Sequence, residues 1–451
     1  MNTDAIIHGE ASGLTRRDFI RITALSTVGF LSGCAVNPVT GKSQLMLVSE
    51  DTEIQVDRTN SPHQFSSDYG VLQDSGLNTY IQEVGKRLAA GTHRPHMPYR
   101  FQGVNATYIN AYAFPGGSIA ATRGILLSLN NEAELSALLG HELGHVNARH
   151  TAQQMSKTMM AQVVVGGVGM VASTRGYGQL ASQLGMLGAG ALLASYSRDN
   201  EREADALGME YMVKTGYGSD GFIGLMSMLN GLSHGKQGSA ADLLFATHPM
   251  SDERYQAAVD RAGETYAAAK NKPLYKERYM DNTAKLRVIK GAITAMQSGE
   301  EAMMKKTYHE AEGRFQTALK QAPNDYAGLV MMAKCQLAQN KNDSAIRYAE
   351  KAKAVYPQEA QSNHLAGFAK IRTKQFDAAL ADFDAYDKKL PGNPNTLFFR
   401  GYALEGMGRR EASATEYKRF LTAVNQGAQA QHAYKRLVEW GYVQPSSSTA
   451  K

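Results

Sequence analysis

The sequence predicts a mostly helical α+β protein, in which a mixed domain with a small β-sheet precedes an all-helical repeat array. Three observations support this fold class. Residues 105–122 are rich in strand-forming residues around a turn signal, residues 135–146 carry apolar side chains at helical spacing, and prolines recur every 34 residues in the C-terminal third. A chain of 451 residues also exceeds the usual size of one domain.

The composition is that of a globular protein. Hydrophobic residues make up 43% of the chain and charged residues 20%, which argues against a largely disordered protein. The net charge of +6 is mild and no run of five basic residues occurs, so we expect no nucleic-acid partner. The two cysteines, Cys34 and Cys335, are too few for a disulfide framework, and the apolar helical surroundings of Cys335 predict a buried, inert thiol.

The N-terminus has the pattern of an export signal. The charged stretch Thr15–Arg21 precedes a short apolar run, Ile22–Leu31, and the tetrapeptide LSGC ends at Cys34. The apolar run is well below the roughly 20 residues that span a bilayer. The paired Arg16 and Arg17 resemble a twin-arginine signal, and LSGC resembles a bacterial lipobox.

These resemblances imply that residues 1–33 are a signal peptide and that Cys34 is acylated on its thiol after cleavage. Residue 35 is Ala rather than the Asp that commonly retains lipoproteins at the inner membrane, which implies an outer-membrane anchor facing the periplasm. Residues 34–44 are then expected to form a lipid-anchored linker. The alternative is a plain amphipathic N-terminus.

Residues 45–265 are expected to form the mixed domain. The stretch NATYINAYAFPGGSIAAT, residues 105–122, predicts two short strands joined by a turn. A helix follows, since Asn131 can cap its start and Glu134 lies three residues further on. Residues 161–195 are rich in Gly and Ala, and their first apolar block is too short to span a membrane, so we expect a flap or closely packed helices there.

The C-terminal third contains a repeat. Pro323, Pro357 and Pro391 lie 34 residues apart. Small residues recur 12 and 24 residues before each proline, at Ala311, Ala345 and Ala379, and at Gly299, Ala333 and Gly367. This is the spacing of tetratricopeptide repeats, which stack helix pairs into a solenoid with a concave binding face. We expect about four repeats and a capping helix in residues 289–443, after a linker at 266–288 and before a tail at 444–451.

The stretch LLGHELGHVNARH, Leu138–His150, places two histidines around a glutamate within a predicted helix. Residues four apart share a helix face, so His141 and His145 can direct ring nitrogens at one point. Zinc accepts neutral imidazole, and catalytic zinc sites use three protein ligands plus water. Glu142 can take a proton from that water as general base. The alternative is three polar residues on an ordinary buried helix.

A third ligand is available in SRDNEREADALGMEY, Ser197–Tyr211. Glu201 and Asp205 are four apart on another helical pattern, so their side chains share a face. Glu201 completes a set of two histidines and one glutamate, and Asp205 can accept the outer ring N–H of a ligand histidine. The alternative is a solvated charged face, which we adopt for Glu203.

HELGHVNARH, the ExxxD pattern of Glu201 and Asp205, and the NAYAFPGG stretch together resemble the M48 family of zinc metallopeptidases, of gluzincin type. The export signal and the C-terminal repeats resemble the BepA-like periplasmic branch of that family. The resemblance implies a gluzincin-type zinc peptidase domain with one Zn²⁺ per chain and a role in outer-membrane protein quality control. Many M48 members carry membrane-spanning helices, and none is predicted here after the signal, so their intramembrane substrates are not carried over.

The same resemblance draws attention to THPMSDER, which contains His248. This histidine could stabilise the oxyanion at the attacked carbonyl, or occupy the open zinc position as a gate. A loop histidine held by Arg254 or by a backbone carbonyl is the equally weighted alternative. His150 lies off the ligand face, and we expect it to be structural.

The resemblance also gives the strand before the turn a function. Gluzincins are expected to hold substrate as an added strand along an exposed sheet edge. The residues expected at that edge are Ala111, Tyr112, Ala113 and Phe114. Backbone pairing is indifferent to side chains, so broad specificity for extended segments follows.

These features predict a zinc-dependent metalloendopeptidase of the bacterial periplasm, tethered to the outer membrane as a lipoprotein. The expected partners are unfolded or misassembled outer-membrane proteins, and the outer-membrane assembly machinery at the repeat face. One alternative is a chaperone or adaptor for outer-membrane protein assembly with latent proteolysis. Another is a scaffold with a structural metal, although structural zinc usually recruits cysteines and none lies near the histidines.

Overall fold

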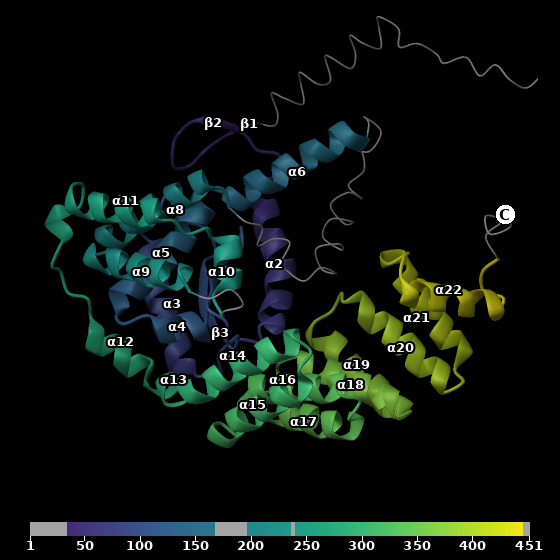
Figure 1. The fold of residues 1–451 in the computed structure, drawn as a ribbon. Helices are drawn as coiled ribbons and strands as arrows, with labels where there is room; N and C mark the ends of the chain where they lie inside the picture. Colours follow the sequence, from purple (N-terminus) through teal and green to yellow (C-terminus); the bar gives the residue numbers. More distant parts are fainter. Residues whose placement is uncertain (1–33, 167–195, 236–239, 445–451) are drawn as a thin grey trace, which may run out of the picture.

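The computed structural model describes residues 34–166, 196–235 and 240–444 (Figure 1). The predicted signal peptide at 1–33 therefore lies outside the described residues, as do segment 167–195, which includes most of the expected flap, and residues 445–451 of the expected tail. Within the described ranges, no helix combines the length and apolar character that crossing a membrane requires.

A three-stranded sheet forms the β part of the N-terminal domain. β3 (Arg100–Val104) pairs in parallel with β5 (Ser118–Thr122), and β5 pairs antiparallel with β4 (Ala111–Ala113). The predicted strand–turn–strand unit corresponds to β4 and β5, whereas β3 was not predicted. The strand order β3-β5-β4 leaves β4 at one edge of the sheet. In the expected linker, β1 (Cys34–Val36) and β2 (Ser43–Leu45) form a separate antiparallel hairpin.

The central element of this domain is α5 (Glu132–Asn147), in which every residue is buried. The Asn131 side chain accepts the Glu134 backbone N–H at 2.9 Å, so the predicted cap starts the helix. Helices α3, α8 and α9 and strand β4 pack against α5. The helices of the domain up to α11 are α2 (Glu50–Ser67), α3 (Ser75–Ala89), α4 (Arg123–Ser128), α6 (His150–Gly166), α8 (Arg198–Lys214), α9 (Asp220–Ser233), α10 (Asp242–Thr247) and α11 (Asp252–Gly263).

The C-terminal part is entirely helical among its described residues. A connecting region contains the 3₁₀ turn η3 (Ala267–Ala269), α12 (Lys276–Asn282) and α13 (Ala284–Val288). Four helix pairs and a last helix follow: α14 (Lys290–Met304), α15 (Tyr308–Gln321), α16 (Tyr326–Ala338), α17 (Asn342–Val355), α18 (Gln361–Arg372), α19 (Phe376–Lys389), α20 (Pro394–Gly406), α21 (Arg410–Ala423) and α22 (Ala428–Glu439). The predicted fold class, a mixed domain followed by a helical solenoid, is confirmed.

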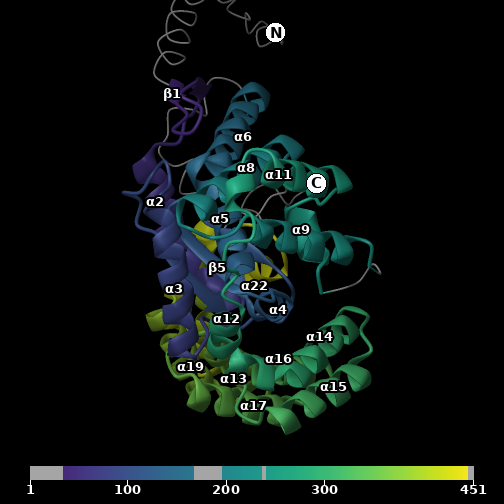
Figure 2. The same cartoon turned by 90° about the vertical axis from the view of Figure 1, so that its left-hand side faces the viewer.

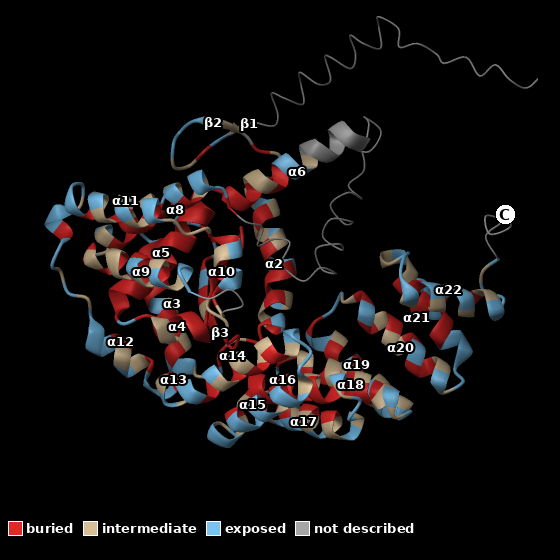
Figure 3. Ribbon diagram, viewed as in Figure 1, coloured by how far each residue is buried: buried red, intermediate tan, exposed pale blue. Residues whose placement is uncertain are grey.

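The repeat positions have a direct packing role. A Cβ atom added to Gly367 would lie 2.9 Å from the Phe383 ring, and one added to Gly401 would lie 2.7 Å from the Tyr417 ring. At these two positions, and at Gly299 beside the Phe315 ring, the first helix needs a small residue where the aromatic side chain of its partner helix packs. Figure 3 shows buried residues on the facing sides of these helices and exposed residues on their outer sides.

The solenoid packs against the N-terminal domain at the end of α2 and at α4 (Figures 1 and 2). Arg123 at the start of α4 forms an ion pair with Asp325 at the start of α16, and both side chains are nearly fully buried. The Tyr69 hydroxyl donates to Glu300 of α14 at 2.9 Å. Burial of a paired charge at this contact means that the two domains form a specific interface.

Candidate active site

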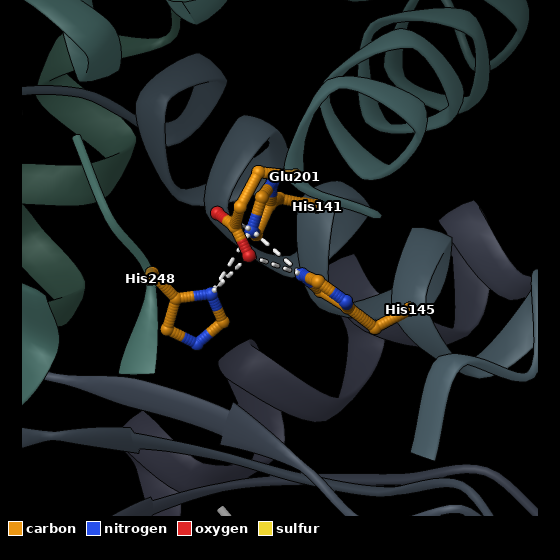
Figure 4. A group of neighbouring side chains, drawn as sticks. All are labelled: His141, His145, Glu201 and His248. Atoms are coloured by element: carbon orange, nitrogen blue, oxygen red, sulfur yellow. Dashed lines mark hydrogen bonds and ion pairs between the residues drawn. The ribbon is translucent and has the colours of Figure 1, made fainter. Parts of the chain in front are cut away.

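Helix α5 places the two predicted histidine ligands side by side. The Nε2 atoms of His141 and His145 lie 3.1 Å apart, as expected for residues one helical turn apart on the same face. Both side chains are buried, and Figure 4 shows their rings converging. Burial lowers the pKa of His145 well below its usual value, although Glu201 opposes this effect. A neutral imidazole is the form that binds a metal ion.

Helix α8 brings the predicted carboxylate ligand to the same point. The Glu201 carboxylate lies 3.3 Å from His145 Nε2 and 3.6 Å from His141 Nε2, and its side chain is fully buried. Burial alone would raise the pKa of Glu201, but His248 and His145 outweigh burial and hold the pKa well below its usual range. The carboxylate is therefore ionised where the two imidazoles meet.

Small residues allow α8 to approach α5 this closely. A Cβ atom on Gly208 would lie 2.7 Å from the His141 backbone nitrogen, and a Cβ atom on Gly144 would lie 2.8 Å from the Ala204 backbone. Real Cβ atoms essentially never lie this close to neighbouring backbone. The glycines of HELGH and of the Glu201 helix thus set the interhelical distance that lets Glu201 reach the histidines.

His248 joins this group from the C-terminal end of α10. Its Nδ1 atom lies 3.2 Å from Glu201 Oε1 and 3.4 Å from His141 Nε2. Its Nε2 atom lies 3.9 Å from Glu142 Oε1. Figure 4 shows the Nδ1 side of the ring directed at the other three side chains. Arg254, the other partner considered for this histidine, contacts Asp205 and Glu201 instead.

The spacing of these donor atoms suits Zn²⁺. One donor atom from each of the four side chains lies within 4.8 Å of the others. Ligands about 2.0–2.2 Å from a tetrahedral zinc ion are separated by about 3.4 Å from one another. The ligand-atom contacts described above, between 3.1 and 3.6 Å, bracket that separation. Three imidazoles and a carboxylate are ordinary zinc donors, so the residues fit the metal.

Glu142 lies one residue after His141 and is 2% exposed. Its Oε2 atom is buried and has no hydrogen-bond partner among the described residues. Burial raises the pKa of Glu142, against the opposing effects of His248 and His141. A buried carboxylate with an unpaired oxygen beside a metal-binding cluster is placed to exchange a proton with a small polar reactant.

Asp205 contacts the outer nitrogen of the first histidine. Its Oδ1 atom accepts from His141 Nδ1 at 2.9 Å. Arg254, which sequence reasoning did not connect with Asp205, donates to both oxygens of this carboxylate at 2.8 Å. Burial raises the pKa of Asp205, but the charge and hydrogen bonds of Arg254 outweigh burial and lower it. The result is an ionised carboxylate fixed between Arg254 and His141.

The second histidine has an equivalent chain of contacts, which the sequence analysis missed. His150 Nδ1 lies 2.9 Å from His145 Nδ1, and His150 Nε2 lies 3.1 Å from Glu203 Oε2. The expectation that His150 lies off the ligand face assumed one continuous helix. In the structure α5 ends at Asn147, Arg149 takes φ +59°, and α6 restarts at His150. This left-handed turn folds His150 back onto His145.

The aromatic ring of Tyr196 also packs against His145. Tyr196 stacks on His145 with ring centroids 3.8 Å apart, and its hydroxyl lies 3.0 Å from Thr151 Oγ1. No sequence pattern distinguished Tyr196, because it precedes α8 by two residues and reaches His145 only through the tertiary fold.

The edge strand lies alongside α5, which carries the two histidines. Asn110 O accepts from Thr122 and Phe114 N donates to Ser118, so even-numbered residues of this stretch face β5. The backbone groups of Ala111 and Ala113 consequently face the free edge. All four predicted edge residues, Ala111, Tyr112, Ala113 and Phe114, are at most 5% exposed with their backbone included, so the edge that was expected to be exposed is covered in this structure.

Known proteins match the chain in two regions. The sequence profile of peptidase family M48 matches residues 75–262, and a tetratricopeptide repeat profile matches residues 302–366. The beta-barrel assembly-enhancing protease of Yersinia pestis is 27% identical over 374 residues, which cover 76% of each chain. The corresponding Escherichia coli protein is 25% identical, and the alignment covers 63% of both chains.

A shorter relative has a higher sequence identity. Metalloprotease YcaL of Escherichia coli is 34% identical over 197 residues, which cover 42% of this chain and 74% of that protein. The M48 profile match, residues 75–262, includes His141, His145 and Glu201. The chain belongs to peptidase family M48 and is a zinc metalloendopeptidase followed by tetratricopeptide repeats.

Proposed function

We propose that His141, His145 and Glu201 are the zinc ligands of this peptidase and that Glu142 is its general base. The observation that carries this assignment is the meeting of donor atoms from two separate helices at tetrahedral spacing, beside a buried carboxylate. The three assigned ligands are the two-histidine, one-glutamate set of catalytic zinc sites.

Each side chain has a distinct part in peptide-bond hydrolysis. Zn²⁺ bound at this cluster supplies Lewis acidity, polarising the scissile carbonyl and making water acidic. Glu142 accepts the proton of the attacking water and returns it to the leaving amine nitrogen. Asp205, itself held by Arg254, accepts the Nδ1 proton of His141 and so keeps Nε2 directed at the metal position.

His150 and Glu203 hold the orientation and tautomer of His145, as Asp205 and Arg254 do for His141. If His145 binds zinc through Nε2, its Nδ1 carries the proton and donates to His150 Nδ1. His150 then carries its own proton on Nε2 and donates to the Glu203 carboxylate. Zinc binding by His145 thus fixes the position of the ring proton on both His145 and His150, which supports a positioning role for His150 and Glu203.

His248 acts as a gate in this proposal. Its Nδ1 atom lies at the separations expected of a fourth ligand, 3.2 Å from Glu201 and 3.4 Å from His141. Water or substrate can reach the metal position only after the ring moves away. The oxyanion role would require the ring to turn from Glu201 toward the substrate carbonyl, so the observed contacts favour the gate.

Substrate is held as a strand added to the outer edge of β4 after that edge, which is buried in this structure, becomes exposed. Backbone groups of Ala111 and Ala113 face that edge, beside the helix that carries the histidines. Main-chain pairing gives affinity without selecting side chains, which suits unfolded or extended polypeptides. Hydrogen exchange supplies a check, since a bound peptide inhibitor should slow exchange at the outward-facing amides and no change would count against strand addition.

The substrates are proposed to be unfolded or misassembled outer-membrane proteins in the bacterial periplasm, with Cys34 as the lipid anchor. The names of the Yersinia pestis and Escherichia coli relatives support a connection with β-barrel assembly. The LSGC pattern supports the anchor. The repeats would recruit these clients or the assembly machinery, as tetratricopeptide arrays present a concave face to proteins.

A second candidate function is a chaperone or adaptor whose proteolysis is latent. The observation that favours it is the position of His248 among the ligand atoms, where it would block the metal from water. The two candidates differ in what a chain without the general base can still do. A Glu142→Gln chain that supported outer-membrane protein assembly fully would favour the chaperone.

The Glu142→Gln variant is also the test of the mechanism. Glutamine keeps the size of the side chain but cannot accept the water proton, so zinc content should stay unchanged while cleavage falls by about two to four orders of magnitude. The assay measures proteolysis of an unfolded outer-membrane protein, with and without a chelator, beside zinc content by elemental analysis. Undiminished cleavage by the variant would remove Glu142 from the mechanism.

A further inference from the structure

A pocket lies between the peptidase domain and the first repeats, on the other side of α10 from the zinc-binding cluster. Its volume is about 610 Å³, in the range of sites that bury small molecules or side chains. Residues from both domains line it, among them Tyr108 and Leu243 of the peptidase domain and Met303, Met304 and Met331 of the repeats. The proposed mechanism uses none of these side chains.

The lining is adapted to apolar ligands of varied shape. Leu243 is 42% exposed and Met304 is 73% exposed, and they stand on opposite domains of the same pocket. Three methionines contribute to the lining, and methionine side chains adjust to differently shaped apolar partners. At the same pocket, Lys334 places its ammonium 4.7 Å from the Tyr69 ring centroid. This ammonium can donate to backbone carbonyls of a bound chain.

The pocket lies next to one end of the proposed substrate edge. Ile109, two residues before β4, donates its backbone N–H to Ala240 O at 2.7 Å. Ala240 and Tyr108 both line the pocket. At the other end of this wall, Leu244 and Phe245 of α10 line the cleft that contains His141, Glu142 and His248. One short segment therefore borders the edge strand, the pocket and the zinc cleft.

We propose that this pocket binds an apolar side chain of the polypeptide whose backbone is held on β4, and so acts as a remote subsite for the substrate. This inference rests on the proposed strand addition at β4. A substrate that reaches the pocket gains binding energy away from the scissile bond. Long unfolded segments with regularly spaced apolar residues would be preferred over short peptides.

The test compares two labelled peptides of alternating Phe and Ser, one of about 6 residues and one of about 14, since at about 3.3 Å per extended residue the longer one extends about 26 Å further. Met304→Glu places a charge in the pocket at an exposed helix end. Val288→Glu is the matched control, because Val288 is 85% exposed and does not line the pocket.

Met304→Glu should raise KM for the long peptide about tenfold and leave its kcat and both constants for the short peptide unchanged. Val288→Glu should change none of these. The inference is overturned if Met304→Glu leaves the long peptide within about twofold of the unaltered chain, or raises KM for both peptides equally.

If the unaltered chain cleaves neither peptide, the proposed function fails. The proposal that the pocket binds substrate is then tested separately, by measuring peptide binding. Fluorescence anisotropy of the long peptide on the chelator-treated chain should show about tenfold weaker binding for Met304→Glu than for Val288→Glu. Equal binding of the long peptide by the two variants would contradict the proposal that the pocket is a substrate subsite. Equally weakened binding of the short peptide would mean that the pocket captures polypeptides independently of the β4 edge, which also contradicts the inference.

Discussion

The two histidines of the zinc-binding cluster are held by different partners. His141 donates toward Asp205, whose carboxylate is fixed by Arg254. His145 instead contacts His150, which contacts Glu203. An uncharged ring is a weaker acceptor than an ionised carboxylate, so the two ligands experience different electron donation from their outer nitrogens. Substitution of His150 and Glu203 can test whether the outer partners of His145 affect zinc binding.

Replacing His150 by Leu should weaken zinc binding about 10- to 100-fold, because His145 loses the acceptor that fixes its tautomer. Glu203→Leu should have a smaller effect in the same direction, and Glu203→Gln, which keeps an acceptor oxygen, should restore affinity. The measurement is zinc competition against a chelating indicator, with the absorption spectrum of the cobalt-substituted chain as a second readout.

Glu210→Leu is the matched control for these variants, because Glu210 lies on the same helix and contacts only Lys214 among the ion pairs of the described residues. It should leave zinc affinity and the cobalt spectrum unchanged. If His150→Leu binds zinc as tightly as the unaltered chain, the histidine is structural, as the sequence analysis expected.

The sequence predicted most of the candidate site because its residues follow local rules. His141, Glu142 and His145 lie within one helix, and the four-residue spacing of Glu201 and Asp205 marks a second helix. The contact of Arg254 with Asp205, the stacking of Tyr196 on His145 and the contact of His150 with His145 were not predicted, because they depend on the tertiary fold. For His150 the contact depends on the left-handed turn at Arg149, which interrupts the helix that the spacing argument assumed.

At the scale of elements, the approach of α5 and α8 decides whether the ligands can meet. Glycines on the two helices face one another, and the Gly140 Cβ position would lie 2.8 Å from the Gly208 carbonyl oxygen. A side chain at this contact must separate the helices. Glu201 would then move away from His141 and His145 without any change to the ligands themselves.

Gly208→Ala should therefore weaken zinc binding and destabilise the domain by about 1–3 kcal/mol, the usual cost of overpacking. Gly231→Ala is the control: it replaces a glycine within α9 whose Cβ position meets no atom within 4 Å. That change should leave zinc affinity unaltered and stabilise α9 slightly. Thermal unfolding and zinc competition measure both effects, and full zinc affinity in Gly208→Ala would contradict the packing argument.

Strand β3 is an element that the sequence did not predict. Its five residues, RFQGV, contain one glycine and two polar side chains, and its partner β5 lies on the far side of β4 in the sequence. The β4–β5 unit was predictable because a local turn joins antiparallel strands. Parallel pairing has no such local signal, since it is set by the packing of the whole domain.

At the scale of the molecule, buried polar contacts join the two domains. Tyr69 and Thr107 both donate to Glu300, Ser66 and Tyr326 both donate to Glu359, and Arg123 pairs with Asp325. The 34-residue period predicted the solenoid, because each repeat follows the same local packing rule. Its docking was not predicted, since it depends on individual side chains far apart in the sequence. That docking forms the interdomain pocket beside α10.

An anomalous difference map at the zinc absorption edge, from crystals of the zinc-loaded chain, would show whether His141, His145 and Glu201 bind one zinc ion. We expect one peak per chain, about 2.0–2.2 Å from Nε2 of both histidines and from the Glu201 carboxylate. The absence of a peak at this position, or a zinc ion bound by other side chains, would contradict this assignment.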